Sequence, residues 1–309
     1  YASALIVMTP QVVVDLGVRR DEQRFRPRFR ASQGSPRVGI EYTPRADTTL
    51  RLSWGQLSQP QRPDELQATD GEREFHAVQT ATQTVGAIEH HLSNDVSLRI
   101  EAFDKRMGSV QPGYENLLDP VTLLPEIEVD RVRVAPLSSR AYGAELSMRW
   151  EPRRTWSAWL SYSWSEVTDR FADSRALRTW DQRHAAVTGV SWTRGSWQLS
   201  GNAIWHNGWR QNSLVVEAAP GGGARLVLAP RNADSWADYF SFDARASWQR
   251  ALPVGALQVY AELSNATDHA NLCCTGYRIA VPGDPASLTS ERSTWLPRYG
   301  LLGVTWLLP

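Results

Sequence analysis

Histidine is the residue type here that most readily binds a metal or transfers a proton, and the chain has six. His90 and His91 are adjacent, so on an extended strand their rings point to opposite faces and do not converge on one ion. His184 follows Asp181-Gln182-Arg183, where we expect a hydrogen-bonded structural role. No Gly-x-Ser-x-Gly motif supplies a nucleophile. The sequence therefore predicts no metal site, no cofactor and no enzymatic activity.

Two other short motifs suggest chemistry. The run Gly221-Gly222-Gly223 lacks the strand, Lys-Ser/Thr pair and helix of a phosphate-binding loop, so we expect a flexible loop tip. Cys273 and Cys274 are adjacent. In an oxidising exterior they either form a strained vicinal disulfide or stay unbridged, and we favour the disulfide.

The composition narrows the class of protein. The 33 Lys+Arg balance 33 Asp+Glu, so net charge does not favour a nucleic-acid partner. The longest apolar run, Ala4 to Met8, is far shorter than the ~20 residues of a membrane-spanning helix. The chain nevertheless contains 14 Trp at a mean hydropathy of -0.40. Because tryptophan collects at membrane interfaces, this combination indicates a membrane protein without spanning helices.

Apolar and polar residues alternate with a period of two along most of the chain, which is typical of strands. The clearest example is residues 240–249, where Phe, Phe, Ala, Ala and Trp alternate with Ser, Asp, Arg, Ser and Gln. We expect about twelve strands of roughly ten residues, which is the length of a tilted strand that crosses a bilayer. They are residues 12–18, 38–42, 48–58, 76–92, 96–101, 142–150, 158–164, 183–193, 197–205, 240–249, 257–264 and 302–308.

The connections between these strands alternate between short and long. Short ones contain turn residues, as at Pro44 to Asp47 and Pro253 to Gly255, whereas long ones are expected at 20–36, 58–74, 109–140, 168–182, 207–237 and 268–296. Short turns on one rim and long loops on the other are typical of an outer-membrane barrel. A soluble β-sandwich is the alternative, but it does not explain tryptophans repeatedly placed near strand ends.

Several stretches resemble the TonB-dependent receptors of the bacterial outer membrane, in the C-terminal part of their barrel domain. The resemblance rests on the order and spacing of motifs over nearly the whole chain. The stretches are Ser35-Pro36-Arg37-Val38-Gly39-Ile40-Glu41-Tyr42, Tyr142-Gly143-Ala144-Glu145-Leu146, Trp180-Asp181-Gln182-Arg183-His184, Glu262-Leu263-Ser264-Asn265-Ala266-Thr267-Asp268 and Gly303-Val304-Thr305-Trp306.

The resemblance implies an all-β, antiparallel up-and-down transmembrane barrel, of which residues 1–309 supply about twelve of about 22 strands. It also implies a plug domain and a TonB complex as partners in a full-length parent, which would import a scarce nutrient such as a ferric siderophore. Nothing in the chain resembles a plug, and no secretory signal is visible at Tyr1, so we expect the chain to start within a longer protein. The alternatives are a complete twelve-stranded passive channel and a soluble binding module.

Charged residues at the polar positions of the strands must face the barrel interior, because an arginine facing lipid at mid-depth costs about 2 to 4 kcal/mol. In the resembled family this wall contacts the plug, and a structural network across the wall is the alternative. We call these residues the lumen set: Glu41, Arg99, Glu101, Glu145, Arg149, Asp243, Arg245 and Glu262.

Loop residues are the candidates for substrate binding, because aromatic and arginine side chains on loops commonly carry recognition. They are Arg26, Arg28, Trp180, Trp209 and Arg210. Arg26 and Arg28 belong to a row of alternate arginines from Arg24 to Arg30. A solvated loop edge is the favoured interpretation of that row, and contact with lipopolysaccharide phosphate or an anionic substrate is the other. Outer-membrane lipid is the remaining expected partner.

Overall fold

The computed structural model describes residues 1–25, 29–119, 121–153 and 155–308. One antiparallel sheet contains fourteen strands, all but β11 (Arg175–Leu177) in one continuous hydrogen-bonded order. In that order the strands are β1 (Ala2–Thr9), β2 (Val12–Phe25), β3 (Phe29–Arg45), β4 (Thr48–Gln59), β5 (Gln79–Ser93), β6 (Val96–Gly108), β9 (Ser138–Arg153), β10 (Trp156–Arg170), β12 (His184–Arg194), β13 (Trp197–His206), β18 (Tyr239–Ala251), β19 (Ala256–Ser264) and β22 (Tyr299–Leu307).

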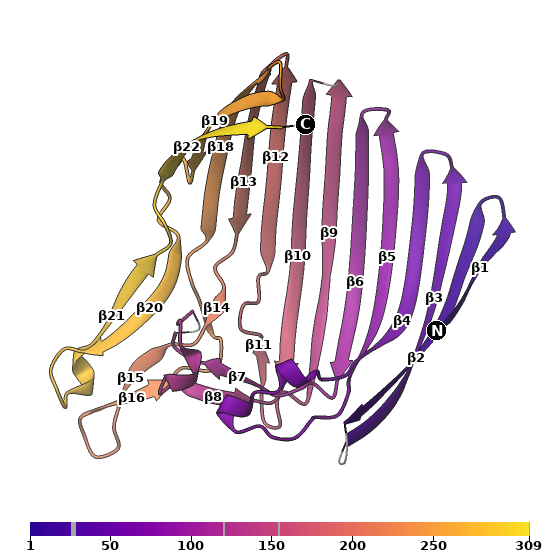
Figure 1. Ribbon diagram of the computed structural model, residues 1–309. Helices are drawn as coiled ribbons and strands as arrows, with labels where there is room; N and C mark the ends of the chain where they lie inside the picture. The colour runs from indigo at the N-terminus through magenta and orange to yellow at the C-terminus, as the bar shows by residue number, and fades with distance from the viewer. Residues whose placement is uncertain (26–28, 120, 154, 309) are drawn as a thin grey trace.

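Each strand of this order pairs with its sequence neighbours, so the sheet is an up-and-down meander. Short turns follow β1, β3, β5, β9, β12 and β18 at one rim, and the long connections gather at the other (Figure 1). This confirms the expected fold class and the alternation of connections. The count of twelve was one strand short, because β1 is apolar without alternation and was not recognised as a strand.

The sheet is curved and open. Among the described residues, β1 pairs only with β2, and β22 pairs only with β19. Its convex face is apolar and uncovered: Leu52 is 56% exposed, and Val304 is 70% exposed. A sandwich would cover that face with a second sheet, and a complete twelve-stranded channel would close the two edges. Neither alternative matches this arrangement.

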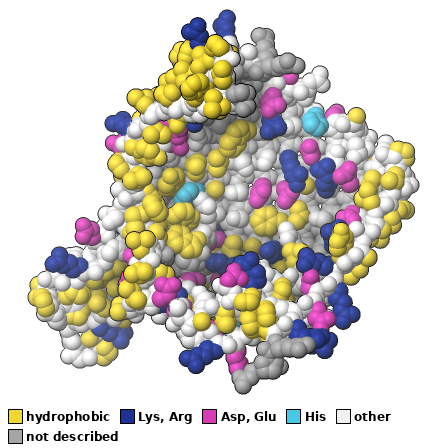
Figure 2. Space-filling model, viewed as in Figure 1, with side chains coloured by type: hydrophobic (Ala, Val, Ile, Leu, Met, Phe, Trp, Pro, Cys, Tyr) yellow, Lys and Arg dark blue, Asp and Glu magenta, His cyan; other side chains and the backbone are white. Residues whose placement is uncertain are grey.

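The two faces of the sheet differ sharply in chemistry. On the convex face, Trp150, Trp156 and Trp197 lie near strand ends and are more than a third exposed. Charged side chains gather instead in the hollow of the opposite, concave face (Figure 2). Register explains this separation, because continuous antiparallel pairing carries each two-residue alternation from one strand to the next.

The prediction of a long loop at residues 20–36 was wrong. β2 and β3 continue to pair through Arg19 opposite Ser35 as far as Phe25 opposite Phe29, so the segment is a long hairpin. At its tip the Phe25 ring stacks on Phe75 of the next connection, with centroids 4.3 Å apart. The segment is rich in charge and lacks an apolar stripe, yet cross-strand hydrogen bonds and this aromatic contact order it.

The other long connections form small structures of their own. Three pairs of short strands form antiparallel hairpins. They are β7 (Gly113–Asn116) with β8 (Arg131–Val134), β15 (Leu214–Ala218) with β16 (Ala224–Leu228), and β20 (Leu272–Ile279) with β21 (Leu288–Thr294). β14 (Arg210–Gln211) pairs with β17 (Asp234–Ser235). The 3-10 helices η1 (Pro63–Glu65), η2 (Ala68–Asp70), η3 (Pro125–Ile127) and η4 (Pro285–Ser287) complete them. We call these connections together the loop layer.

Within the described ranges, the protein contains no helix with the length and apolar character needed to traverse a bilayer.

The convex face can be tested at two neighbouring positions of β10. Leu160 lies mid-strand on the convex face, opposite Met148, whereas Ser161 faces the concave side opposite Ser147. Leu160→Arg should lower the free energy of unfolding from lipid vesicles by about 2 to 4 kcal/mol, and Ser161→Arg by much less. Urea titration of the full-length protein measures both. Equal losses at the two positions would contradict the assignment of the convex face to lipid.

Candidate functional site

The loop layer is held together by a buried asparagine, Asn232, which is 2% exposed. Its backbone N–H donates to Asn212 Oδ1 at 3.0 Å, and its side-chain amide donates to the Leu177 carbonyl at 2.8 Å. Asn212 in turn donates to the Leu117 carbonyl at 3.1 Å. Two asparagine side chains of the connection after β13 therefore link it to the connections after β6 and β10. Its φ of 54° lies in the left-handed region that asparagine tolerates.

Ion pairs reinforce the same junction. Arg231 contacts Glu115 at 2.6 Å, and the Thr179 hydroxyl donates to the same carboxylate at 2.8 Å. Nearby, Arg178 contacts the buried Asp169 at 2.6 Å. These contacts join residues 52 or more positions apart in most cases, so the loops are packed as one layer.

The β7–β8 hairpin docks on the connection between β4 and β5 through two arginines. Arg131 contacts Asp70 at 2.5 Å, with side-chain exposures of only 11% and 7%, and Arg133 contacts Glu72 at 2.6 Å. The hydrogen bond from Arg131 lowers the pKa of Asp70, and the one from Arg133 lowers the pKa of Glu72. Both carboxylates are therefore favoured in the charged, paired form.

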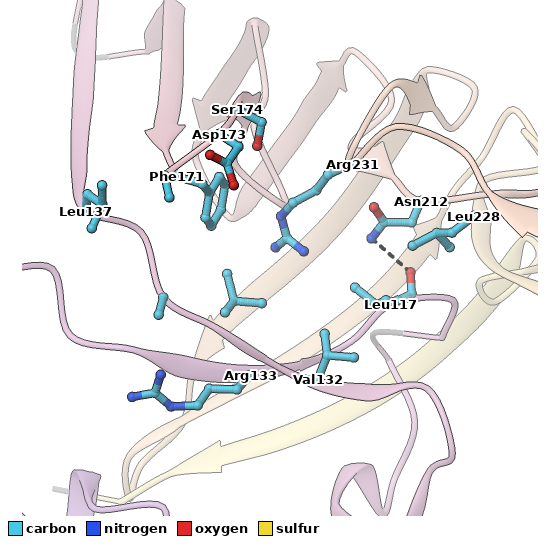
Figure 3. A pocket seen from close by; sticks show the side chains of 13 residues that line it. Leu117, Val132, Arg133, Leu137, Phe171, Asp173, Ser174, Asn212, Leu228 and Arg231 are labelled. Carbon is cyan, nitrogen blue, oxygen red and sulfur yellow. Dashed lines mark hydrogen bonds between the residues drawn. The ribbon is translucent and has the colours of Figure 1, made fainter.

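A pocket of about 510 Å³ opens within the loop layer (Figure 3). Leu117, Val132 and Leu228 contribute apolar wall, and Arg231 projects toward the space between Phe171 and Asn212. The Arg231 guanidinium lies 5.8 Å from the Phe171 ring centroid. Because Arg231 is already paired with Glu115, this arginine does not offer the pocket an uncompensated positive charge.

An aromatic cluster lies beside this junction. Trp180 meets Trp209 edge to face, with ring centroids 5.0 Å apart, and both rings lie 6.0 Å from Trp236. His206 stacks on Trp209 at 4.8 Å and on Tyr239 at 4.9 Å. The structure thus brings together two of the sequence-predicted substrate residues, Trp180 and Trp209, and adds three others. His206 is the last residue of β13 and Tyr239 the first of β18. An aromatic side chain at a strand end resembles an interfacial anchor, so the sequence did not indicate that these two belong to the cluster.

Asp181 and Arg210 support this cluster. Asp181 is 4% exposed and accepts a hydrogen bond from the Val167 N–H at 2.7 Å. Burial raises the Asp181 pKa, while the charges of Arg183 and Arg210 act in the opposite direction. The predicted residue Arg210 lies in β14, opposite Ser235, and its role in substrate binding stays a prediction.

A second pocket, of about 480 Å³, extends from the aromatic cluster into the loop-side mouth of the concave face. We call it the aromatic pocket. Its ring-bearing lining residues are His206, Trp209, Tyr239, Trp295 and Tyr299. Polar groups complete it: Asp243 accepts from the Asn265 N–H at 2.8 Å, and Asn271 binds the Phe240 backbone N–H and carbonyl. Flat rings with a few fixed polar groups suit a small planar molecule.

The lumen set lies on the concave face, where ion pairs join neighbouring strands. Arg51 on β4 shares this face and contacts Glu41 on β3 at 2.9 Å and Glu89 on β5 at 2.8 Å. Arg99 and Glu101 are paired on β6 at 2.5 Å. These contacts are those of a structural network across the wall. Their contact with a plug stays a prediction.

Glu145 is the exception in this network. It lies directly opposite Glu101 on β6 and opposite Ser163 on β10. Among the described residues, no ion pair includes Glu145. Two carboxylates therefore face each other with only Arg99 close to one of them.

The remaining members of the lumen set lie toward the two ends of the face. Arg149 contacts Glu151 at 3.5 Å near the short-turn rim. Arg245 contacts Glu262 at 3.4 Å and lies 4.1 Å from the Tyr260 ring centroid. Asp243 belongs to the aromatic pocket. The aromatic pocket thus brings Asp243 next to loop-layer residues, a neighbourhood that strand alternation alone did not indicate.

Arg26 and Arg28 lie outside the described residues. Their described neighbours are paired within the hairpin, with Glu22 contacting Arg24 at 2.8 Å and Arg30 at 3.2 Å.

The cysteines and histidines complete the list of predicted groups. Cys273 and Cys274 are unbridged, unlike the disulfide favoured from sequence. Cys273 lies at a bulge in β20 and is buried. Burial, together with the neighbouring Cys273 thiol, raises the pKa of Cys274 to about 12. His184 accepts or donates a 2.7 Å bond with the Tyr162 hydroxyl. Across the described ranges, no three His, Cys, Asp or Glu residues converge on a metal position.

The sequence matches the family model of the TonB dependent receptor-like beta-barrel over residues 1–266. The chain belongs to this family. Family membership makes it part of an outer-membrane receptor or transporter of Gram-negative bacteria, as the resemblance implied. The solved structures named below are likewise receptors and transporters.

Solved structures agree on the fold. The ferripyoverdine receptor of the Pseudomonas aeruginosa outer membrane matches with a TM-score of 0.64 at 15% identity, covering 98% of this chain and 37% of that one. The ferric preacinetobactin receptor from Acinetobacter baumannii matches at 0.59 and 16%, covering 96% and 40%. The copper transporter OprC matches at 0.61 and 13%, covering 97% and 46%. This TonB-dependent receptor segment therefore spans less than half of each.

A search of the curated proteins by sequence found no match.

The docking of β7–β8 should depend on pH. Because the Asp70 pKa is lowered in the folded state, its stabilising contribution is present above the usual aspartate value near ~3.9 and is lost as pH falls through the lowered value. The protection factor of the amides in residues 113–134, which is the intrinsic exchange rate divided by the observed rate at the same pH, should be high at pH 7 in the full-length receptor. It should fall when the pH is taken below the lowered Asp70 pKa. Asp70→Asn should lower the protection factor at pH 7 also.

Asp64→Asn is the matched control, because Asp64 pairs only with exposed Arg62 on its own connection. If exchange at pH 7 responded equally to both substitutions, the Asp70–Arg131 contact would not hold the hairpin.

Proposed function

We propose that residues 1–309 form the C-terminal portion of a longer barrel domain, in a receptor that imports a scarce small molecule of the ferric siderophore class. Its length relative to the solved neighbours supports this, since the chain spans 37% to 46% of them. Two of those neighbours bear the names of ferric siderophore receptors. The chain would supply wall and recognition loops, while a plug and a TonB complex would supply gating and energy.

The observation that carries the proposal is the aromatic pocket. It lies where the loop layer meets the concave face, which is the position a solute must pass to enter the lumen. His206, Trp209 and Tyr239 offer stacked rings, and Asp243 with Asn271 offers hydrogen bonds. An aromatic iron-chelating group such as a catecholate is a flat ring with oxygen donors at its edge, so it matches both features.

The lumen set supports a plug as the inner partner. Like charges directly opposite on neighbouring strands are destabilising, and Glu101 and Glu145 are such a pair. A basic side chain of the plug would sit between these carboxylates and relieve the repulsion. Arg51 and Arg245 are already paired within the wall, so they are less available for this contact.

The outer partners follow from the same orientation. The convex face would contact membrane hydrocarbon, and the long loops would lie on the cell exterior among lipopolysaccharide. The arginines of the β2–β3 hairpin are compatible with that surface, although Arg24 and Arg30 share Glu22.

The function can be tested by uptake in cells. The full-length receptor is expressed in a strain lacking its own siderophore receptors, and ⁵⁵Fe-loaded pyoverdine and preacinetobactin are supplied as probes. We expect saturable uptake of at least one probe that requires TonB. Trp209→Ala with Tyr239→Ala should raise the half-saturation concentration by roughly tenfold or more, as expected for aromatic anchors.

Trp156→Ala is the control, because Trp156 lies at the short-turn end of β10, away from the aromatic pocket. Non-saturable uptake without TonB would instead identify a passive channel. Failure of both probes to bind would contradict the ferric siderophore class.

A further inference from the structure

The convex face carries two arginines directly opposite each other at the loop-side end of the wall, Arg106 on β6 and Arg140 on β9. The register of these strands is continuous from Val96 opposite Trp150 to Gly108 opposite Ser138, so both side chains share the face of the apolar residues below them. Arg106 is 72% exposed and Arg140 is 44% exposed.

Only one carboxylate serves both guanidinium groups. Asp104 accepts from Arg140 Nε at 2.9 Å and from Arg106 Nε at 3.2 Å. Like charges placed opposite each other repel, and Asp104 balances one of the two. The group therefore carries one uncompensated positive charge that points away from the barrel.

Aromatic side chains mark the depth of this group. Tyr142 lies directly below Arg140 on the same face, and the Arg140 guanidinium is 4.9 Å from its ring centroid. Tyr142 meets Trp164 of β10 edge to face, with centroids 5.8 Å apart. Tyrosine and tryptophan lie at the level of lipid headgroups, so the arginines just beyond them lie among the headgroups.

Hydroxyl groups extend the surface on the neighbouring strand. Thr82 lies opposite Arg106, and Thr84 lies opposite Asp104, on the same convex face of β5. These hydroxyls can donate to phosphate or sugar oxygens. Guanidinium groups bind phosphate oxygens in a fork, which an isolated hydroxyl does not.

We propose that Arg106 and Arg140, with Thr82 and Thr84 beside them, form a docking surface for the phosphorylated sugar headgroup of lipopolysaccharide in the outer leaflet. The inference rests on the orientation in the proposed function, with the long loops on the cell exterior. The phosphate would sit between the two guanidinium groups and supply the negative charge that Asp104 alone does not. The surface is separate from the aromatic pocket, so it concerns the lipid and not the imported nutrient.

The test uses the full-length receptor purified from outer membranes in mild detergent, with bound lipopolysaccharide counted by native mass spectrometry. The double variant Arg106→Gln, Arg140→Gln should lose roughly tenfold or more of the bound lipopolysaccharide, since each arginine near an anionic lipid surface contributes about fivefold. Arg106→Lys, Arg140→Lys keeps the charge and should retain most of it. Retention of the heat-modifiable barrel form on gels confirms that each variant folds.

The matched control is Arg194→Gln, Arg250→Gln. These exposed arginines lie on the convex face too, but at the short-turn end, where Arg194 is opposite Trp197 and Arg250 is opposite Leu257. Bound lipopolysaccharide should be unchanged in this variant. Unchanged binding after loss of Arg106 and Arg140, or an equal loss in the control, would overturn the proposal.

Two further arms identify the source of the phosphate. Inorganic phosphate and phosphatidylglycerol nanodiscs are each offered in competition with lipopolysaccharide. Lipopolysaccharide should remain bound in both, and displacement by either at equal concentration would overturn its assignment. Uptake of the ⁵⁵Fe-loaded probes is measured in the same variants. Loss of lipopolysaccharide with uptake retained supports this surface, and absent uptake with lipopolysaccharide retained contradicts only the proposed nutrient.

Discussion

The two-residue period of the extended backbone is the constraint on which the rest of the structure depends. A strand in hydrocarbon must satisfy every backbone N–H and C=O through its neighbours, so the sheet is continuous and its register fixed. Once register is fixed, each side chain has one of two destinations. Leu160 and Ser161 differ by one position and occupy opposite faces. The apolar wall, the charged hollow and the outward arginines are all consequences of this alternation.

The loop layer obeys a different rule, because alternation ends where the strands end. There the order comes from buried amides and ion pairs between distant segments, as at Asn232 and at Arg131 with Asp70. Such contacts leave no period in the sequence. Arg131, for example, pairs with Asp70 through two of its nitrogens and with Asn116 through the third. A layer stiffened in this way can present a shaped pocket without a hydrophobic core of its own.

Sequence reasoning reached the fold class, most of the strands and the alternation of short and long connections, because all three depend on local period and turn residues. It missed β1, whose residues are apolar on both faces, and it read the charged β2–β3 hairpin as a loop. It selected Trp180 and Trp209 singly, as exposed loop aromatics. Trp236 escaped because its contact with Trp180 spans 56 positions and is fixed by loop packing. His206 and Tyr239 join the cluster by stacking on Trp209 and on each other, which alternation along the strands did not indicate. The vicinal disulfide was favoured from adjacency, but Cys273 lies at a bulge in β20 and the two cysteines are unbridged.

Strands β6 and β9 show how one register can serve two environments. On the concave side they place Glu101 opposite Glu145, and five residues along β6, on the convex side, they place Arg106 opposite Arg140. Each is a like-charge pair in a wall whose other charges are mostly matched with opposite ones. A repulsive pair is stable in a sheet when the surroundings supply the missing charge. The signs fit the two sides: carboxylates face the interior, where a protein plug can offer a base, and guanidinium groups face outward, where an anionic lipid can offer phosphate. The unmatched charges of a barrel wall thus point to what lies beyond it.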